Sequence, residues 1–436
     1  MPYKISSQIA ICFLLISGLV FSDVRAADTL TLAQCLERAK TKSPTIRLAD
    51  NALRSADLSK QEFRTTAFPQ LKIAAGASFA PMTPHFGYDP ALSNGGQIGA
   101  QVVAEQPLYD GGRRNLKTQM ANIDLARLLT ERKQVARDLE FAVTQAFIAA
   151  LQAQLEETLQ QQNLAQLADY YELVKRLNAG GAVGYTDLLK TRADLSAAGI
   201  TAEQAVEAVA LAKYALAELM GTPEDTAFIP SGSLEEVTGD SIAAMYEEKP
   251  IDTMHVLDLA IANFFYKRSL TEILDARREW YPAVSLVGDF GLLTSRQNLQ
   301  LQEPDRSSTI GYSIGITFEM PLFDWGGRDL RIQERQLAAE ASKFQMEALQ
   351  RSLVAEYQKA RLQLLKARSR LIAIRANIKV VEDNFLLTKS KYAAGALTAT
   401  EVLNAQQLLT ETKAAEIQTM AEIQTLLARI KQITTE

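Results

Sequence analysis

Two stretches of the chain, residues 113–179 and 328–394, contain neither proline nor glycine. At 1.5 Å per residue, a continuous helix over either stretch would be about 100 Å long. In the second stretch the apolar residues alternate in steps of four and three, a period of 3.5 that is typical of left-handed coiled coils. They are Leu353, Tyr357, Ala360, Leu364, Ala367, Leu371, Ile374, Ile378, Val381 and Phe385. The pattern predicts long helices that pack lengthwise on other helices.

Each long stretch ends in a turn that contains glycine, at residues 180–184 and again around Gly395. Helical patterns resume after these turns, which predicts further helices over 187–220 and 401–434. Gly181 and Gly395 therefore mark the tips of two predicted helical hairpins.

Four shorter segments alternate apolar residues with small or polar ones, as strands with two different faces do. They lie at about 70–80, 97–107, 283–293 and 310–321, and polar loops connect each pair. In the clearest segment, isoleucines and aromatic residues at even positions alternate with Gly311, Ser313, Gly315, Thr317 and Glu319. One face suits lipid, and the other suits a watery or closely packed interior.

The same motif joins the second strand of each pair to the long helix that follows. Residues 105–113 are Glu-Gln-Pro-Leu-Tyr-Asp-Gly-Gly-Arg, and residues 319–328 are Glu-Met-Pro-Leu-Phe-Asp-Trp-Gly-Gly-Arg. The prolines of these joints and the glycines of the tips recur at one offset of 214 residues, which predicts two internal repeats. We expect the proline of each motif to end its strand, the glycine pair to allow the bend, and the arginine to begin the helix. The residues concerned are Pro107, Gly111, Gly112 and Arg113 in the first joint, and Pro321, Gly326, Gly327 and Arg328 in the second.

The predicted organisation is a signal peptide at 1–26, a first repeat at 27–220, an irregular connection at 221–250 and a second repeat at 251–436. The apolar run 9–21 follows Lys4, is too short to span a bilayer, and precedes a small-x-small cleavage site ending at Ala26. Each repeat opens with a shorter helix, from Leu30 to Arg64 with a break near Ser43-Pro44, and from 251 to 279.

Composition excludes several classes of function. The formal charge is −5, about −6 without the signal peptide, and no basic cluster suits nucleic acid. Cys35 would be the single cysteine of the exported chain, and His85 and His255 have no partner at metal-ligand spacing, so we expect no disulfide, metal or cofactor. After residue 26 no apolar run is long enough for a transmembrane helix, so strands must make any crossing. Four strands cannot close a barrel, which predicts an oligomer.

The duplicated strand pairs and long helices, the two joints and the two glycine tips resemble the TolC-type outer membrane efflux protein family over essentially the whole mature chain. The resemblance implies a mixed α and β membrane protein that forms a homotrimer. Four strands per chain would complete a transmembrane β-barrel of twelve strands in outer membrane lipid, and the helices would continue it as a periplasmic coiled-coil barrel that is closed at its tip at rest. It also implies docking at the tips with a periplasmic membrane-fusion adaptor and an inner-membrane transporter.

The resemblance also implies roles for residues near the tips. Asp187 and Tyr392 correspond to residues of the closed tip, Glu401 to an acidic ring around the aperture, and Asn404 to a position where a second acidic ring is usual. Leu397 stands where the type member has an arginine, which argues against a full salt-bridge lock. Because Asn404 is uncharged, the sequence supports a single acidic ring, formed by Glu401. The alternative for Glu401 and Asp187 is that each stabilises the start of its helix, and for Tyr392 that it is a coiled-coil seam residue.

The leading hypothesis is a passive exit duct in the bacterial outer membrane, serving an efflux or type I secretion system. The alternative is a periplasmic coiled-coil adaptor or scaffold, which should lack lipid-facing strands. An enzyme is a third and weaker hypothesis, and the sequence does not identify the cargo.

Overall fold

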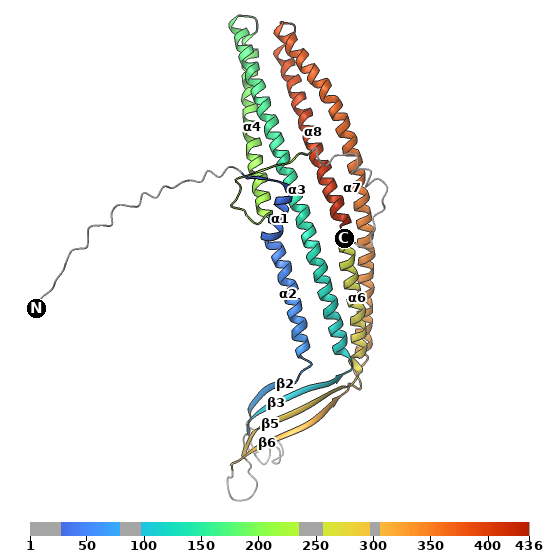
Figure 1. Ribbon diagram of the computed structural model, residues 1–436. Helices are drawn as coiled ribbons and strands as arrows, with labels where there is room; N and C mark the ends of the chain where they lie inside the picture. The colour runs from blue at the N-terminus through green and yellow to red at the C-terminus, as the bar shows by residue number, and fades with distance from the viewer. Residues whose placement is uncertain (1–27, 79–96, 235–255, 297–305, 436) are drawn as a thin grey trace, which may run out of the picture.

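The computed structural model describes residues 28–78, 97–234, 256–296 and 306–435. A long bundle of helices stands on a four-stranded sheet at one end (Figure 1). The predicted signal peptide and parts of the predicted connection and strand loops lie outside the described residues. No helix in the described ranges is both long and apolar enough to cross a membrane.

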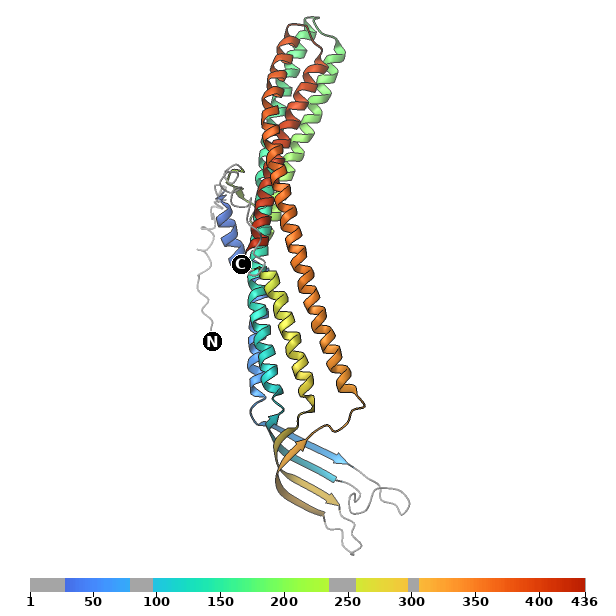
Figure 2. The same cartoon turned by 90° about the vertical axis from the view of Figure 1, so that its right-hand side faces the viewer.

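Two helices of 67 residues, α3 (Arg113–Ala179) and α7 (Gly327–Ala393), run the length of the bundle. Toward the tips they pack against α4 (Tyr185–Leu219) and α8 (Ala399–Thr434) respectively, and α3 also packs against α8. Toward the sheet, α2 (Pro44–Thr65) packs on α3, and α6 (Leu257–Arg277) packs on both α3 and α7 (Figure 2). The bounds of the four longest helices agree with the predicted ones to within two residues, because the glycine-containing joints and tips beside them are visible in the local sequence.

The coiled-coil seam predicted in α7 faces the core. Seven of its positions are buried: Leu353, Tyr357, Ala360, Leu364, Ala367, Leu371 and Val381. Ion pairs with α8 flank this seam, among them Arg375–Glu416 at 2.8 Å and Lys413–Glu382 at 2.7 Å. Pairs of this kind beside a seam help to fix which helix faces which.

The sheet is antiparallel, in the order β2 (Gln70–Ser78), β3 (Gln97–Asp110), β5 (Ala283–Arg296) and β6 (Arg306–Glu319). The register aligns the apolar residues of neighbouring strands: Ile73 lies opposite Val102, Val102 opposite Phe290, and Phe290 opposite Tyr312. The opposite face carries Lys72, Asp289 and Ser313 in one row. The apolar face is open, with Ile73 and Tyr312 each 79 % exposed, and the pairing of the described residues leaves β2 and β6 as edge strands.

The expectation that Pro107 ends its strand is wrong. Strand β3 continues to Asp110, which pairs with Ala283, and the register shifts between Pro107 and Tyr109. Proline has no N–H to donate to a ladder, and a bulge is one of the places where a strand accommodates it. Strand β6, in contrast, ends at Glu319, two residues before Pro321, so this proline lies outside the strand.

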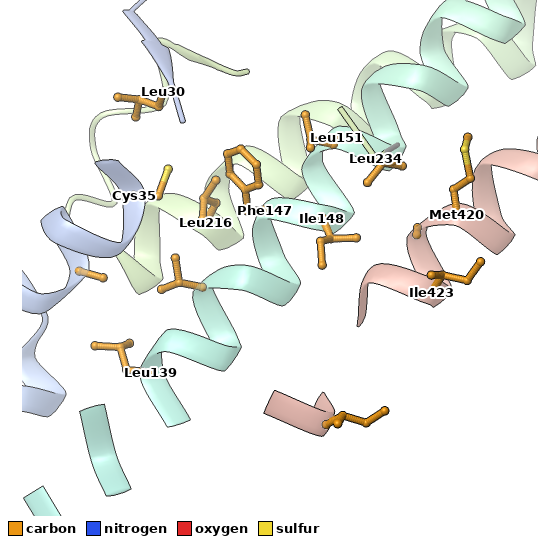
Figure 3. Packing of buried hydrophobic residues seen from close by; sticks show 14 of the residues in the cluster. Leu30, Cys35, Leu139, Phe147, Ile148, Leu151, Leu216, Leu234, Met420 and Ile423 are labelled. Carbon is orange, nitrogen blue, oxygen red and sulfur yellow. The ribbon is translucent and has the colours of Figure 1, made fainter. Parts of the chain in front are cut away.

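A core of buried apolar residues lies about halfway along the bundle, where β1 (Asp28–Leu30) pairs in parallel with β4 (Phe228–Pro230). Helix α1 (Leu32–Lys42) begins here, with Thr31 and Gln34 in a reciprocal capping box. Cys35, Phe147 and Leu216 are among the buried residues of this core (Figure 3). The connection predicted to be irregular therefore contains a strand, β4, whose three residues are too few to show a periodic pattern.

Candidate functional site

The first joint is built around an aspartate that the sequence analysis did not single out. The Asp110 carboxylate accepts hydrogen bonds from the backbone N–H groups of Gly112, at 3.1 Å, and Arg114, at 2.7 Å. These are donors that the first turn of α3 cannot use internally, and a negative charge is favourable there. Gly111 and Gly112 have φ values of +70° and +76°, so the predicted bend is made by this pair.

The second joint uses the same device with different residues. The Asp324 carboxylate accepts from the Arg328 N–H at 2.7 Å, but the left-handed residues are Trp325, with φ +59°, and Gly326, with φ +82°. Gly327 is the first residue of α7, so the predictions that Gly327 makes the bend and that Arg328 begins the helix are wrong. Counted from the aspartates, Trp325 occupies the position of Gly111. An L-residue in this conformation costs about 1–2 kcal/mol, which makes a tryptophan here unusual.

A polar cluster holds the first joint against the end of α6 and the short helix η1 (Arg278–Trp280). Arg113 donates to both carboxylate oxygens of Asp275, at 3.0 and 2.9 Å, and Arg278 donates to the Gly112 carbonyl at 2.9 Å. The hydrogen bond from Arg113 to Asp275 raises the pKa of Arg113, so this cation is retained. The start of α3 is thereby fixed to the end of the helix that precedes β5.

Gly111→Ala is expected to destabilise the fold by more than the strain of its backbone alone. An added Cβ would lie 2.5 Å from the Tyr281 Cβ, a distance that requires the backbone to move. The matched control is Gly395→Ala, at φ +75° with open space around the added Cβ, which should cost about 1–2 kcal/mol. Thermal unfolding followed by circular dichroism checks this, and equal losses for the two variants would contradict it.

The two tips have the same backbone geometry. At the first, the N–H groups of Gly181 and Ala182 donate to Asn178 and Leu177; at the second, those of Gly395 and Ala396 donate to Tyr392 and Lys391. Gly181 and Gly395 have φ values of +74° and +75°, a left-handed cap that glycine adopts without strain. Both predicted tip glycines are therefore at the ends of their helices.

Tyr392 lies in a buried cluster that joins the two hairpins. It is 3 % exposed, and its ring meets that of Tyr170 edge to face with centroids 5.3 Å apart. Burial raises the pKa of both tyrosines, and the negative charge of Asp187 acts in the same direction. The charge of Asp187 therefore acts on Tyr392, and the structure adds Tyr170 to this cluster, with its hydroxyl 3.5 Å from the Ala399 carbonyl.

Glu401 has a local role in the single chain. Its carboxylate accepts from the Thr398 N–H at 2.7 Å and from the Thr398 hydroxyl at 2.9 Å, which completes a capping box. These hydrogen bonds lower its pKa. Glu401 and Asn404 are both exposed, one turn apart on α8.

Asp187 lies in the first turn of α4, where the N-cap residue is Gly184 and no side chain caps the helix, so Asp187 does not form a capping box like that of Glu401.

Two polar contacts between the hairpins were missed by the sequence analysis. Lys190 on α4 donates to the Thr400 hydroxyl at 3.0 Å. Deeper in the bundle, buried Gln406 donates to Asn163 at 2.9 Å and Gln166 at 2.7 Å. Gln406 could have indicated the second contact from the sequence, because it lies in an apolar seam and buried polar groups are almost always hydrogen-bonded.

The family model described as outer membrane efflux protein matches residues 35–222 and 257–436, which is most of the chain. The chain belongs to the outer membrane efflux protein family. As a member, it is a protein of the bacterial outer membrane, with a tunnel that extends into the periplasm, and its relatives are channel proteins.

Solved structures show the same fold at low sequence identity. The outer-membrane channel OprN matches with a TM-score of 0.73 and 19 % identity over 92 % of this chain and 89 % of that one. The outer membrane protein VceC of Vibrio cholerae matches with a TM-score of 0.73 and 16 % identity over 92 % and 96 %. The MtrE outer membrane channel of Neisseria gonorrhoeae, in its open state, matches with a TM-score of 0.71 and 17 % identity over 92 % and 88 %. A search of curated proteins finds no match.

Proposed function

We propose that this protein is the outer-membrane exit duct of a tripartite efflux or type I secretion system. The observation that carries the proposal is the sheet, which has one open apolar face and two free edges and continues into helices of 67 residues. Strands with unpaired edges are unfavourable in lipid, so several copies must share one closed barrel.

Three copies would give a barrel of twelve strands that is continued by a tunnel of helices. The two halves of the chain act as repeats in this assembly, so that joints and tips alternate around the axis. The apolar face of each sheet contacts lipid, and the face with Lys72 and Asp289 lines the interior.

The tips around Gly181 and Gly395 are the proposed docking sites for a periplasmic membrane-fusion adaptor, which links the duct to an inner-membrane transporter. Both tips are exposed and lie at the end of the bundle that is remote from the sheet (Figure 1). Energy and cargo choice belong to the transporter in this proposal. Crosslinkers placed at the two tips should recover the cognate adaptor.

The aperture is proposed to lie at the tips as well, with Asp187 and Tyr392 in the contacts that close it and Glu401 in a ring of three carboxylates. Such a ring concentrates negative potential in a narrow opening and favours cations. Asn404, one turn further along α8, adds no charge to this ring.

Glu401→Gln is expected to lower the cation-to-anion permeability ratio several-fold in planar bilayers. Glutamine can replace glutamate in a capping box, so the start of α8 is preserved and the lost charge is tested alone. Protonation of Glu401 removes the same charge, so acid should lower the ratio of the wild type toward that of Glu401→Gln. In the single chain the hydrogen bonds from Thr398 lower the pKa of Glu401, so the cation preference should be fully present at neutral pH. Asn404→Ala is the uncharged control, and unchanged selectivity in Glu401→Gln would leave Glu401 with its capping role alone.

The duct itself is tested with the purified full chain. We expect it in outer-membrane fractions, as an oligomer in mild detergent that resists dissociation without boiling, with ion conductance after reconstitution. A monomer in the soluble periplasm would overturn the proposal and favour an adaptor or scaffold.

A further inference from the structure

The second joint carries an exposed cluster of large apolar residues, Leu322, Phe323 and Trp325, which we call the aromatic wedge. Their exposed fractions are 82 %, 69 % and 88 %, and the rings of Phe323 and Trp325 meet edge to face with centroids 4.9 Å apart. Among the described residues, Trp325 is the one non-glycine with a positive φ. Backbone strain of this kind persists where surrounding contacts compensate for it. Within the single chain Trp325 is almost fully exposed, so a contact that compensates for its backbone strain must come from another molecule.

The first joint provides a template for such a contact. Gly111 occupies the position of Trp325, and Tyr281 lies directly against it. Tyr281 is brought there because β5, which starts two residues later, pairs with β3. The contact at the first joint is therefore a consequence of strand pairing between the two halves of one chain.

The same elements recur at the free edges of the sheet. Phe68-Pro69 comes directly before β2, just as Tyr281-Pro282 comes directly before β5. Likewise, the second joint lies at the end of β6, as the first lies at the end of β3. Strands β2 and β6 are the two edges, so the equivalent contact can form only between two copies. Phe68 is 65 % exposed in the single chain, as an unpartnered counterpart would be.

We propose that the aromatic wedge is the docking surface for the Ala67-Phe68-Pro69 turn of a second copy of this chain. The proposal rests on the proposed function, because it requires the oligomer. It assigns the contact between the second joint of one copy and the turn before β2 of the next. The two contacts differ in residue size. At the first joint an added Cβ on Gly111 would lie 2.5 Å from the Tyr281 Cβ, so the second contact cannot copy the first atom for atom. The larger Trp325 would meet a turn in which Phe68 takes the place of Tyr281, and this turn must lie further from the wedge than Tyr281 lies from Gly111.

The template also specifies the register between copies. In one chain, Gln101 lies opposite Gly291 and Glu105 opposite Val287. The equivalent pairs between copies are Gly315 with Ser78 and Glu319 with Ala74. This register keeps the apolar faces of β2 and β6 on one side of the barrel, whereas a slip of one residue would turn one of them inward.

Disulfide crosslinking tests the register in the full chain in membranes. Cysteines at Glu319 and Ala74 together should give covalent oligomers on oxidation, because Cβ atoms directly opposite in a sheet lie within disulfide reach. The matched control, Glu319→Cys with Lys72→Cys, is shifted by two residues on the same face and should crosslink poorly. The native Cys35 is fully buried and burial raises its pKa, so it should not compete. Equal crosslinking of both pairs, or strong crosslinking of the shifted pair alone, would overturn the register.

Substitution of the wedge tests the contact itself. Trp325→Gly restores the residue of the first joint, and it should lower the temperature at which the oligomer dissociates in detergent by several degrees. Phe68→Ala should do the same, and the double variant should be no worse than either single one, because both remove one contact. Phe290→Ala, on the open apolar face, is the control that should leave oligomer dissociation unchanged. Additive losses from Trp325→Gly and Phe68→Ala would overturn the contact.

Lipid, rather than a second copy of the chain, could cover the aromatic wedge, and tryptophan fluorescence distinguishes the two. In a Trp280→Phe background, Trp325 is the remaining tryptophan. Brominated phospholipid in proteoliposomes should leave its fluorescence largely unquenched if Phe68 of a second copy covers it, and strong quenching would overturn the proposal. If the unsubstituted protein neither assembles nor conducts, the proposed function fails; if it does both and the wedge variants are inert, only this inference fails.

Discussion

Ile314→Arg is expected to prevent the protein from reaching its oligomeric form in the outer membrane. Ile314 is 75 % exposed on the apolar face and lies opposite Gly288, near the middle of β6. An arginine at the lipid face of a barrel costs about 2–4 kcal/mol at the bilayer midplane, and a trimer would contain three of them. Membrane fractionation and electrophoresis without boiling should show loss of the oligomer.

The control for this prediction is Thr317→Arg, on the opposite face of the same strand. If that face lines an aqueous interior, the arginine stays hydrated and assembly should be retained. Equal tolerance of both substitutions would show that neither face contacts lipid.

Arg137→Ala is expected to destabilise the helical part of the chain. The Arg137 guanidinium, 9 % exposed, contacts Asp258 at the start of α6 at 2.6 Å and Asp138 at 2.9 Å. Removing the cation leaves the partly buried Asp258 carboxylate with the hydrogen bond from Gln134, at 2.7 Å, so the loss should lie at or below the lower end of the about 3–5 kcal/mol for a fully buried pair. The thermal midpoint of helix unfolding measures this loss.

A second variant distinguishes the loss of the Arg137–Asp258 ion pair from a loss of packing at the same site. Arg137→Met combined with Asp258→Leu removes both charges, and it should recover much of the stability. Arg132→Ala, which breaks an exposed pair with Asp50, is the matched control and should have little effect. A double variant no more stable than Arg137→Ala would assign the effect to packing instead.

The same pair predicts a dependence on pH. Burial alone would raise the pKa of Asp258, but the hydrogen bond and charge of Arg137 outweigh it, and the pKa is lowered from 3.8. The contribution of a depressed carboxylate is fully present above its ordinary pKa and is lost as the pH falls through the folded value. The difference between the wild type and Arg137→Ala should therefore be constant near neutral pH and shrink below pH 3.8.

The sequence predicted the parts of the fold that local patterns determine. The bounds of α3 and α7, the seam from Leu353 onward and the two-faced strands all follow from spacing along one segment. The bulge at Pro107 depends on where β5 pairs with β3, and β4 exists because β1 lies beside it. Neither partner is visible in the segment itself.

The candidate site was also predicted only where a local pattern determines it. The tip glycines recur in a local motif, and their conformation follows from it. The second joint was misassigned because its motif was aligned on Gly-Gly-Arg; counting from Asp324, which caps α7, places Trp325 and Gly326 in the bend. Tyr170 and Lys190 were missed because their partners, Tyr392 and Thr400, lie in the other half of the chain.

The parallel pairing of β1 with β4 has a consequence for the order in which an exported chain can fold. Strand β1 lies near the N-terminus, and β4 follows the whole first hairpin of α3 and α4. If the chain is exported from its N-terminal end, β1 enters the periplasm long before β4. Leu30 then stays exposed until Phe228 is available to pack against it. Parallel pairs between distant segments form slowly, since the intervening chain must be ordered first. The middle of the bundle should therefore be the last part of the first half to close, and the region where an assembly chaperone would find exposed apolar surface.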